Sequence, residues 1–168
     1  MSQENVEIVR QAWEAYVRRD NEAAFALYDP EIEIDLTASP ALTARVYRGL
    51  NGVGEFFGDW VSAFADVTSE VEEWIDAGER VIAMVHSYGR GKRSGVPVEM
   101  LEAHLWTVRD GKLRRLQTFP TKAEALKAAG LTAQAAGVAD GRGWFRTSDL
   151  SPVKRDGVGA HELGYPAL

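Results

Sequence analysis

The sequence predicts an α+β domain in which helices cover one face of a mostly antiparallel sheet. Three predicted helices begin before residue 65, where apolar residues recur at helical spacing, while later segments alternate apolar and polar residues. The stretch from Glu102 to Leu131 reads without a gap as strand, tight turn, strand and closing helix. This order of elements is typical of α+β proteins.

Two helices are predicted near the N-terminus. The first is amphipathic and about five turns long, and its apolar stripe comprises Val6, Val9, Trp13 and Val17. Asp20 can then cap a second, short helix over residues 21–28, because its carboxylate can accept a hydrogen bond from a backbone N–H of the first turn. Asp29 and Pro30 end this helix.

A strand and a third helix follow. Over residues 31–36, EIEIDL, apolar residues alternate with carboxylates, which predicts a half-buried strand with all of its carboxylates on one face. An irregular segment over residues 37–47 separates it from a helix that opens near Gly49. A wide apolar stripe is typical of a helix laid across a sheet, and it comprises Val53, Phe56, Phe57, Trp60, Val61 and Phe64.

The second half of the chain predicts four strands in a meander and a short helix. The strands cover residues 69–78, 79–91, 97–108 and 113–119. Asp110 and Gly111 supply the last turn, since both tolerate a positive φ. Pro120 stops the strand pairing, and Thr121 with Glu124 forms a capping box for the Ala-rich helix.

Composition restricts the classes of function. The 168 residues, 45% of them apolar, are enough for one buried core. The net charge of −6 argues against a nucleic-acid-binding surface, which needs clustered lysine and arginine. The absence of cysteine excludes disulfides, a thiolate nucleophile and a cysteine-based zinc site. No signal peptide or membrane span is recognisable, so a cytoplasmic protein is expected.

The last residues differ from the rest. We expect one domain over residues 1–131 and a separate tail over residues 132–168, which holds six of the 16 glycines and two of the six prolines without a sustained apolar period. Such a composition predicts a mostly disordered segment. Two alternatives stay open: an arm that covers a neighbouring subunit through Trp144 and Phe145, and a tail that recruits a partner.

The order of elements, with AEALKAAGL closing the chain after the WTVRDGKL hairpin, resembles the SnoaL-like branch of the nuclear-transport-factor-2-like superfamily from Val6 to Leu131. This branch contains polyketide cyclases and is related to ketosteroid isomerase and limonene epoxide hydrolase. The resemblance implies a cone, in which a curved antiparallel (mixed) sheet wraps around the three helices and opens to a mostly apolar pocket. It also implies a homodimer. It does not fix the function, because this fold hosts several enzymes and plain binding modules.

The resemblance to ketosteroid isomerase implies a general-base aspartate inside the cone just after the first strand, where Asp35 falls. The isomerase also uses two oxyanion donors, a tyrosine on the first helix and a protonated aspartate before a histidine. Counting along the chain places them at Ala12, one turn before Tyr16, and at Ala103. Because losing one such donor typically costs ~10²–10³ in rate, isomerisation by that mechanism is not expected. The aspartate-arginine-aspartate relay of the epoxide hydrolase is not completed either.

Glu102 and His104 form the second candidate for catalysis. Two residues apart on one strand, they share a face, and the carboxylate can orient the imidazole for acid-base chemistry. If Leu101, Ala103 and Leu105 point into the cone instead, the pair lies on the dimer surface with Trp106. Residue types also allow a metal site from His86 with this pair, but no close ligand spacing supports it, so no metal is predicted.

Aromatic residues are abundant enough to offer a flat apolar ligand a stacking surface. Each is also a candidate for the ordinary core. The candidate ligand-binding set comprises Trp13, Tyr16, Phe56, Trp60, Tyr88 and Phe119.

The leading hypothesis is a protein that binds an apolar small molecule and transfers a proton on it without a cofactor, as in isomerisation, cyclisation or hydration. Asp35, His104 and Glu102 are its candidate catalytic residues. The alternative is a non-catalytic ligand-binding or dimerising module of the same fold. No nucleic-acid or membrane partner is expected.

Overall fold

The computed structural model describes residues 2–39, 42 and 44–132. Apart from Thr132, the predicted tail over residues 132–168 lies outside the described residues, and so do its proposed roles. Among the described residues, no helix is both long and apolar enough to cross a membrane.

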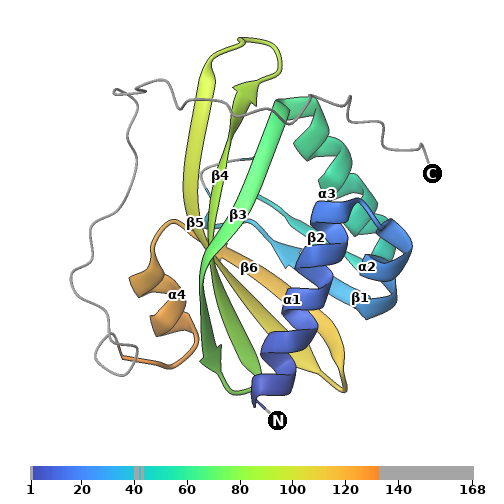
Figure 1. The fold of residues 1–168 in the computed structure, drawn as a ribbon, viewed down its shortest axis with the longest axis vertical. Coiled ribbons are helices and arrows are strands. Elements are labelled where there is room, and N and C mark those ends of the chain that lie inside the picture. Colours follow the sequence, from blue (N-terminus) through green and yellow to red (C-terminus); the bar gives the residue numbers. More distant parts are fainter. Residues whose placement is uncertain (1, 40–41, 43, 133–168) are drawn as a thin grey trace.

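The described residues form four helices and six strands, as the α+β prediction required (Figure 1). The helices are α1 (Ser2–Arg18), α2 (Asn21–Leu27), α3 (Gly49–Ala63) and α4 (Lys122–Ala128). The strands are β1 (Tyr28–Asp35), β2 (Val46–Arg48), β3 (Phe64–Ala77), β4 (Arg80–Gly91), β5 (Pro97–Arg109) and β6 (Lys112–Phe119). They build one sheet in the order β2-β1-β6-β5-β4-β3. Only the β1–β6 pair within it is parallel, and the short edge strand β2 was not predicted.

Helix caps form largely as the sequence predicts. The Asp20 carboxylate accepts a hydrogen bond from the backbone N–H of Ala23 at 3.0 Å and so begins α2. Thr121 Oγ1 accepts the backbone N–H of Glu124 at 3.2 Å and begins α4. The Glu124 carboxylate accepts the Thr121 hydroxyl at 2.8 Å, so the reciprocal contact uses the side chain of the cap.

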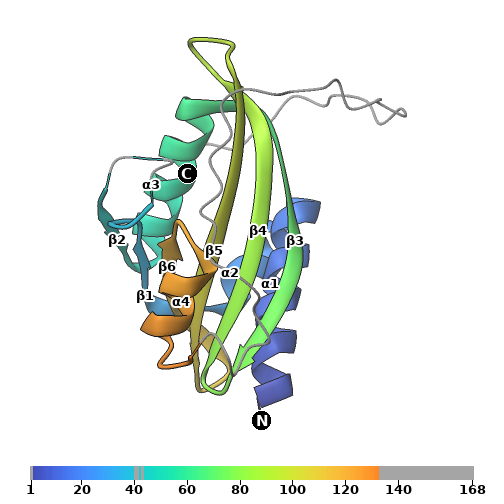
Figure 2. The same cartoon turned by 90° about the vertical axis from the view of Figure 1, so that its left-hand side faces the viewer.

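The sheet is covered on both faces. Figures 1 and 2 show α1 and α3 against one face of the long strands, here called the inner face, and α4 against the opposite, outer face. The inner core joins Val9 of α1 and Val53 of α3 to Trp106 of β5. The outer core is smaller and joins Leu126 of α4 to Leu105 of β5. The hairpin of β4 and β5 extends beyond the rest of the sheet.

A change of register between β5 and β6 decides which side chains reach the inner face. Near the turn, Arg109 pairs with Lys112 and Val108 with Leu113. Beyond an irregularity between Thr107 and Val108 the pairing shifts by one residue, so that His104 lies opposite Thr118. A β-bulge of this kind inserts one unpaired residue and reverses the facing of every residue after it.

Ion pairs cover the outer face of β1, where the alternation of EIEIDL places its carboxylates. Arg115 of β6 contacts Glu33 at 3.1 Å and Asp35 at 2.9 Å. Asp35 also accepts the backbone N–H of Thr37 at 3.0 Å and its hydroxyl at 2.6 Å. Partial burial raises the pKa of Asp35, but the hydrogen bonds from Thr37 and Arg115 outweigh it, so the pKa lies below its usual 3.8.

Replacing Asp35 with asparagine is expected to lower the free energy of unfolding by about 1–3 kcal/mol near neutral pH, because Arg115 loses a charged partner. A lowered folded-state pKa means that this stabilisation is complete above the unfolded pKa, near 3.8, and disappears as the pH falls through the folded-state value. Urea denaturation of both proteins across this pH range measures the difference. The control is Asp110→Asn, whose side chain is 95% exposed. A difference that persists unchanged in acid would contradict the assignment.

Candidate functional site

A cavity of about 80 Å³ lies between the inner face of the sheet and helices α1 and α3. This volume holds several water molecules, each of which needs at least ~10–15 Å³. It is smaller than the ~300–1,000 Å³ of typical ligand pockets, so a larger guest requires side chains to move. Aromatic residues form much of the wall, and they are Trp13, Tyr16, Tyr28, Phe56, Phe57, Trp60 and Trp106.

The aromatic wall is continuous from α1 to α3. Tyr16 stacks on Phe57 with ring centroids 5.8 Å apart and lies 5.4 Å from Trp13. Phe56 contacts Phe57 at 5.1 Å and Trp60 at 6.3 Å. Flat faces on two helices therefore offer an apolar ring a surface on which to stack.

Glu102 places a buried carboxylate at the cavity. The residue is 7% exposed, and its Oε1 accepts the Ser39 hydroxyl at 2.6 Å. Burial raises the pKa of Glu102, but the neighbouring imidazole of His104 and the Ser39 hydroxyl lower it by more, so the pKa lies below its usual value. The carboxylate is therefore charged at neutral pH.

His104 lies beside this carboxylate and also lines the cavity, so the pair faces inward and not toward an outer dimer surface. Its Nε2 is 4.0 Å from Glu102 Oε2, too long for a hydrogen bond but close enough for strong electrostatic interaction in an apolar site. Trp13 packs against the imidazole edge to face, with centroids 6.4 Å apart. Nδ1 of His104 is buried without a hydrogen-bond partner among the described residues. The carboxylate favours the proton on Nε2, which leaves a lone pair on Nδ1.

Further polar groups line the cavity. Ser69 and Ser87, on neighbouring strands, share a hydrogen bond of 2.7 Å. Burial, and secondarily the nearby Tyr16, raises the pKa of Tyr28 to about 12, so that phenol stays neutral. Trp106 Nε1 and Thr118 Oγ1 are buried and, within the described chain, lack a hydrogen-bond partner. The cavity thus combines apolar walls with a few polar groups, as binding sites commonly do.

Six of the nine predicted site residues line this cavity, and they are Glu102, His104, Trp13, Tyr16, Phe56 and Trp60. The expectation that Asp35 lies inside the cone is wrong in position, because Ile34 and Leu36 face inward and Asp35 faces Arg115. Its contacts with Thr37 stabilise the turn in which Ser39 donates its N–H to Leu36. Asp35 is therefore placed to support Ser39 and does not itself line the cavity.

Tyr88 and Phe119 also lie outside the cavity. Tyr88 is 43% exposed and packs edge to face on His86, with centroids 5.6 Å apart. Phe119 packs against the outer core under α4. The β5–β6 bulge explains the error for Phe119, because without it Phe119 would face inward and Thr118 outward.

Ala103, the position that corresponds to the isomerase's protonated aspartate, does not line the cavity either. Ala103 is fully buried in the outer core, and its inward-facing neighbour on the strand is Glu102. Ala12 does line the cavity, one turn from Tyr16.

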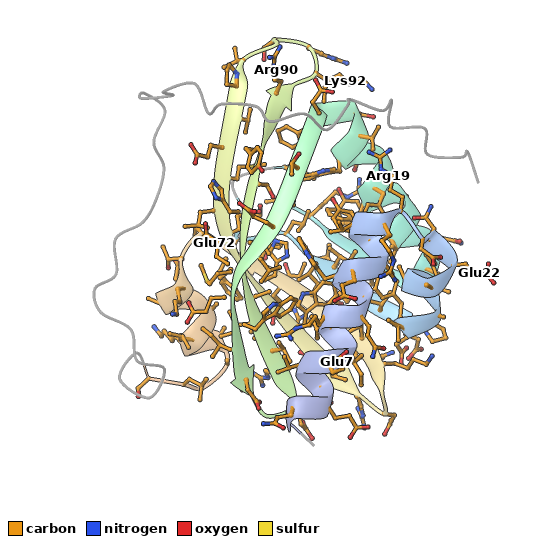
Figure 3. All side chains as sticks on the ribbon, viewed as in Figure 1. Glu7, Arg19, Glu22, Glu72, Arg90 and Lys92 are labelled. Atoms are coloured by element: carbon orange, nitrogen blue, oxygen red, sulfur yellow. The ribbon has the colours of Figure 1, made fainter. Side chains whose placement is uncertain are left out.

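The metal alternative requires His86 to join Glu102 and His104. His86 lies between Glu72 and Glu99, with its ring nitrogens 3.1 and 2.8 Å from their carboxylates. Figure 3 shows Glu72 on the side of the sheet away from α1. The three residues therefore lie on opposite faces and cannot share an ion. In the part of the chain that the structure describes, no group of three or more histidine or acidic side chains is arranged to hold a metal.

Sequence reasoning missed several cavity residues, chiefly Ser39, Phe57 and Thr118. Phe57 belonged to the predicted apolar stripe of α3 and could have been selected from it. Thr118 required knowledge of the bulge. No pattern in the irregular segment over residues 37–47 indicated Ser39, which reaches Glu102 across 63 positions of sequence.

Replacing Ser39 with alanine is expected to raise the pKa of Glu102, because the charged carboxylate loses the hydrogen bond from the Ser39 hydroxyl while it stays buried. A carbon-13 NMR titration of the side-chain carboxyl measures this change. Ser62→Ala is the control, since its hydroxyl donates to the carbonyl of Gly58 on α3. An unchanged Glu102 titration in the Ser39 variant would show that the 2.6 Å hydrogen bond from the Ser39 hydroxyl does not stabilise the charged carboxylate.

Comparison with known proteins shows the family to which the chain belongs. The family model of the SnoaL-like domain matches residues 9–116. An NTF2-like protein from Burkholderia pseudomallei K96243 is similar in structure, with a TM-score of 0.62, 21% identity, and coverage of 74% of this chain and 95% of its own. An NTF2-like protein from Burkholderia xenovorans LB400 has a TM-score of 0.61, 25% identity, and coverage of 77% and 97%.

A third similar structure is that of TerC, which was co-crystallised with polyporic acid. Its TM-score is 0.60 at 22% identity, over 69% of this chain and 90% of TerC. No curated protein matches the sequence significantly. The family model spans more than half of the chain, so this protein belongs to the SnoaL-like domain family, within the NTF2-like superfamily.

Proposed function

We propose that this protein binds a small, flat, mostly apolar molecule in the inner cavity and transfers a proton on it without a cofactor. His104 is the base and Glu102 holds it. One observation carries the proposal: a buried carboxylate and a largely buried imidazole lie side by side at an apolar cavity, and one imidazole nitrogen has no hydrogen-bond partner among the described residues. Titratable groups in such clefts are candidates for acid-base chemistry.

The roles follow from charge and position. Nδ1 of His104 takes a proton from an acidic C–H of the ligand, whose bonding electrons become an enolate-type anion. If the imidazolium first exchanges its proton with solvent and returns the solvent-derived proton to the same carbon, the result is an exchange. If it delivers the abstracted proton to another carbon, the result is an isomerisation. Glu102 stays charged because its pKa is lowered, and it stabilises the imidazolium formed in between. The two side chains are only 16% and 9% exposed, so this electrostatic stabilisation is stronger than it would be at the surface.

TerC supports the binding half of this proposal, since a chain of the same fold was co-crystallised with a small organic molecule. The second candidate, a binding module without catalysis, has an observation in its favour. The aspartate that the isomerase resemblance placed inside the cone lies on the outer face, bound to Arg115. The two candidates share a ligand cavity and differ only in proton transfer.

The test is hydrogen-deuterium exchange at the carbon next to the carbonyl of 2-indanone, a compact flat ketone, followed by proton NMR in D₂O. The wild-type protein is expected to accelerate exchange over buffer. His104→Gln is expected to lose ~10²-fold or more of that acceleration, as is typical for removal of an acid-base group. Glu102→Gln is expected to lose less, because the base remains but is no longer paired with a charge.

Glu99→Gln is the matched control, because it removes a carboxylate of β5, the strand of Glu102, on the outer face, where Glu99 contacts His86. It is expected to exchange at the wild-type rate. Binding of the ketone, followed by quenching of tryptophan fluorescence, is measured alongside. Binding without accelerated exchange would favour the non-catalytic module, and no binding at all would contradict both candidates.

A further inference from the structure

The geometry points to Trp106 and Thr118 as a pair of hydrogen-bond donors that binds an acceptor oxygen of the ligand beside His104. This inference deepens the proposed function and rests on its cavity. It names a ligand class: a neutral flat molecule whose ring carries a carbonyl or similar acceptor oxygen at the end that enters the cavity. It also assigns specificity to two residues that neither the sequence patterns nor the isomerase resemblance selected.

Burial is the first support. Trp106 is 8% exposed and Thr118 is 4% exposed, and both line the cavity. Neither the indole Nε1 nor the hydroxyl Oγ1 has a hydrogen-bond partner among the described residues. A buried polar group without a partner is costly and uncommon in native proteins, so two of them in one cavity require an explanation. A ligand oxygen that accepts a hydrogen bond from each donor would supply this explanation.

Strand pairing brings the two donors together. His104 lies opposite Thr118, and Trp106 lies opposite Leu116 on the same face. Trp106 and Thr118 are therefore diagonal neighbours on adjacent strands, a relation in which backbones are ~7–8 Å apart and long side chains reach each other. Because His104 lies opposite Thr118, a ligand oxygen that accepts from both donors would lie next to His104.

The chemistry of the donors selects the ligand. An indole N–H can only donate, so its partner must be an acceptor. Glu102 is an acceptor, but its Oε1 is engaged by Ser39. No lysine or arginine occurs among the described residues that line the cavity, so a carboxylate ligand would meet the negative charge of Glu102 without a compensating cation. A neutral oxygen with free lone pairs fits these constraints.

The experiment compares 2-indanone with indane, which has the same bicyclic shape and no oxygen. Fluorescence titration gives the affinity of each compound for each variant. The wild-type protein is expected to prefer the ketone. Thr118→Val keeps the shape of the side chain and is expected to weaken ketone binding about 3- to 10-fold, the usual effect of one neutral hydrogen bond, while indane affinity changes less than about 2-fold. Trp106→Phe is expected to act in the same direction.

Two further measurements separate donation from a structural role. Thr118→Ser restores the hydroxyl and is expected to restore the ketone preference. Thr118→Val is expected to unfold at the same or a higher urea concentration than the wild type, because the lost hydroxyl had no partner. If Trp106→Phe does not fold, the valine and serine variants at position 118 still decide the question.

The outcomes distinguish this inference from the proposed function. Equal affinity for ketone and indane in the wild-type protein would overturn the donor pair, as expected if the two groups hold only water, while small-molecule binding stands. A ketone preference unaffected by Thr118→Val and Trp106→Phe would also overturn it. A preference that both variants remove supports it, even if exchange at the ketone is not accelerated and proton transfer fails. Binding of neither compound would overturn both proposals.

Discussion

The register between β5 and β6 is the constraint on which the site depends. A shift of one residue near the turn places Thr118 opposite His104 and turns Phe119 to the outer face. Without it, glutamine at position 117 would stand opposite His104, and a phenylalanine ring would fill part of the cavity. One unpaired residue in β6 therefore determines which side chains of β6 the sheet presents to α1 and α3.

The two covered faces of the sheet differ in the side chains that they bury. On the outer face, α4 covers a small apolar cluster, and Arg115 joins the carboxylates of β1. The inner face keeps polar groups that a purely structural core would exclude. A buried carboxylate typically costs several kcal/mol unless it is paired. Among the described residues, Glu102 has a serine hydroxyl at 2.6 Å and an imidazole at 4.0 Å. Retaining a charge in so apolar a place is typical of functional sites.

Periodicity predicted most of the fold and part of the site. Alternation in EIEIDL correctly set the carboxylates apart from the apolar residues of β1, whereas resemblance to an enzyme placed Asp35 on the wrong side. Helical spacing put Trp13 on the apolar stripe of the first helix and Phe56 and Trp60 on that of the third, and these residues line one cavity with Tyr16. The short strand β2 and Ser39 could not be predicted, because both fall in a segment without a period and are held by contacts with residues distant in sequence.

The central claim is that Glu102 holds His104 with its proton on Nε2 and a free lone pair on Nδ1. Long-range nitrogen-15 NMR of the imidazole distinguishes the tautomers directly, with the His104→Gln variant assigning the signals. At a pH where His104 is neutral, the account predicts that the pyrrole-type nitrogen is Nε2 and that Glu102→Gln weakens this preference. A spectrum in which Nδ1 carries the proton in the wild-type protein would contradict it.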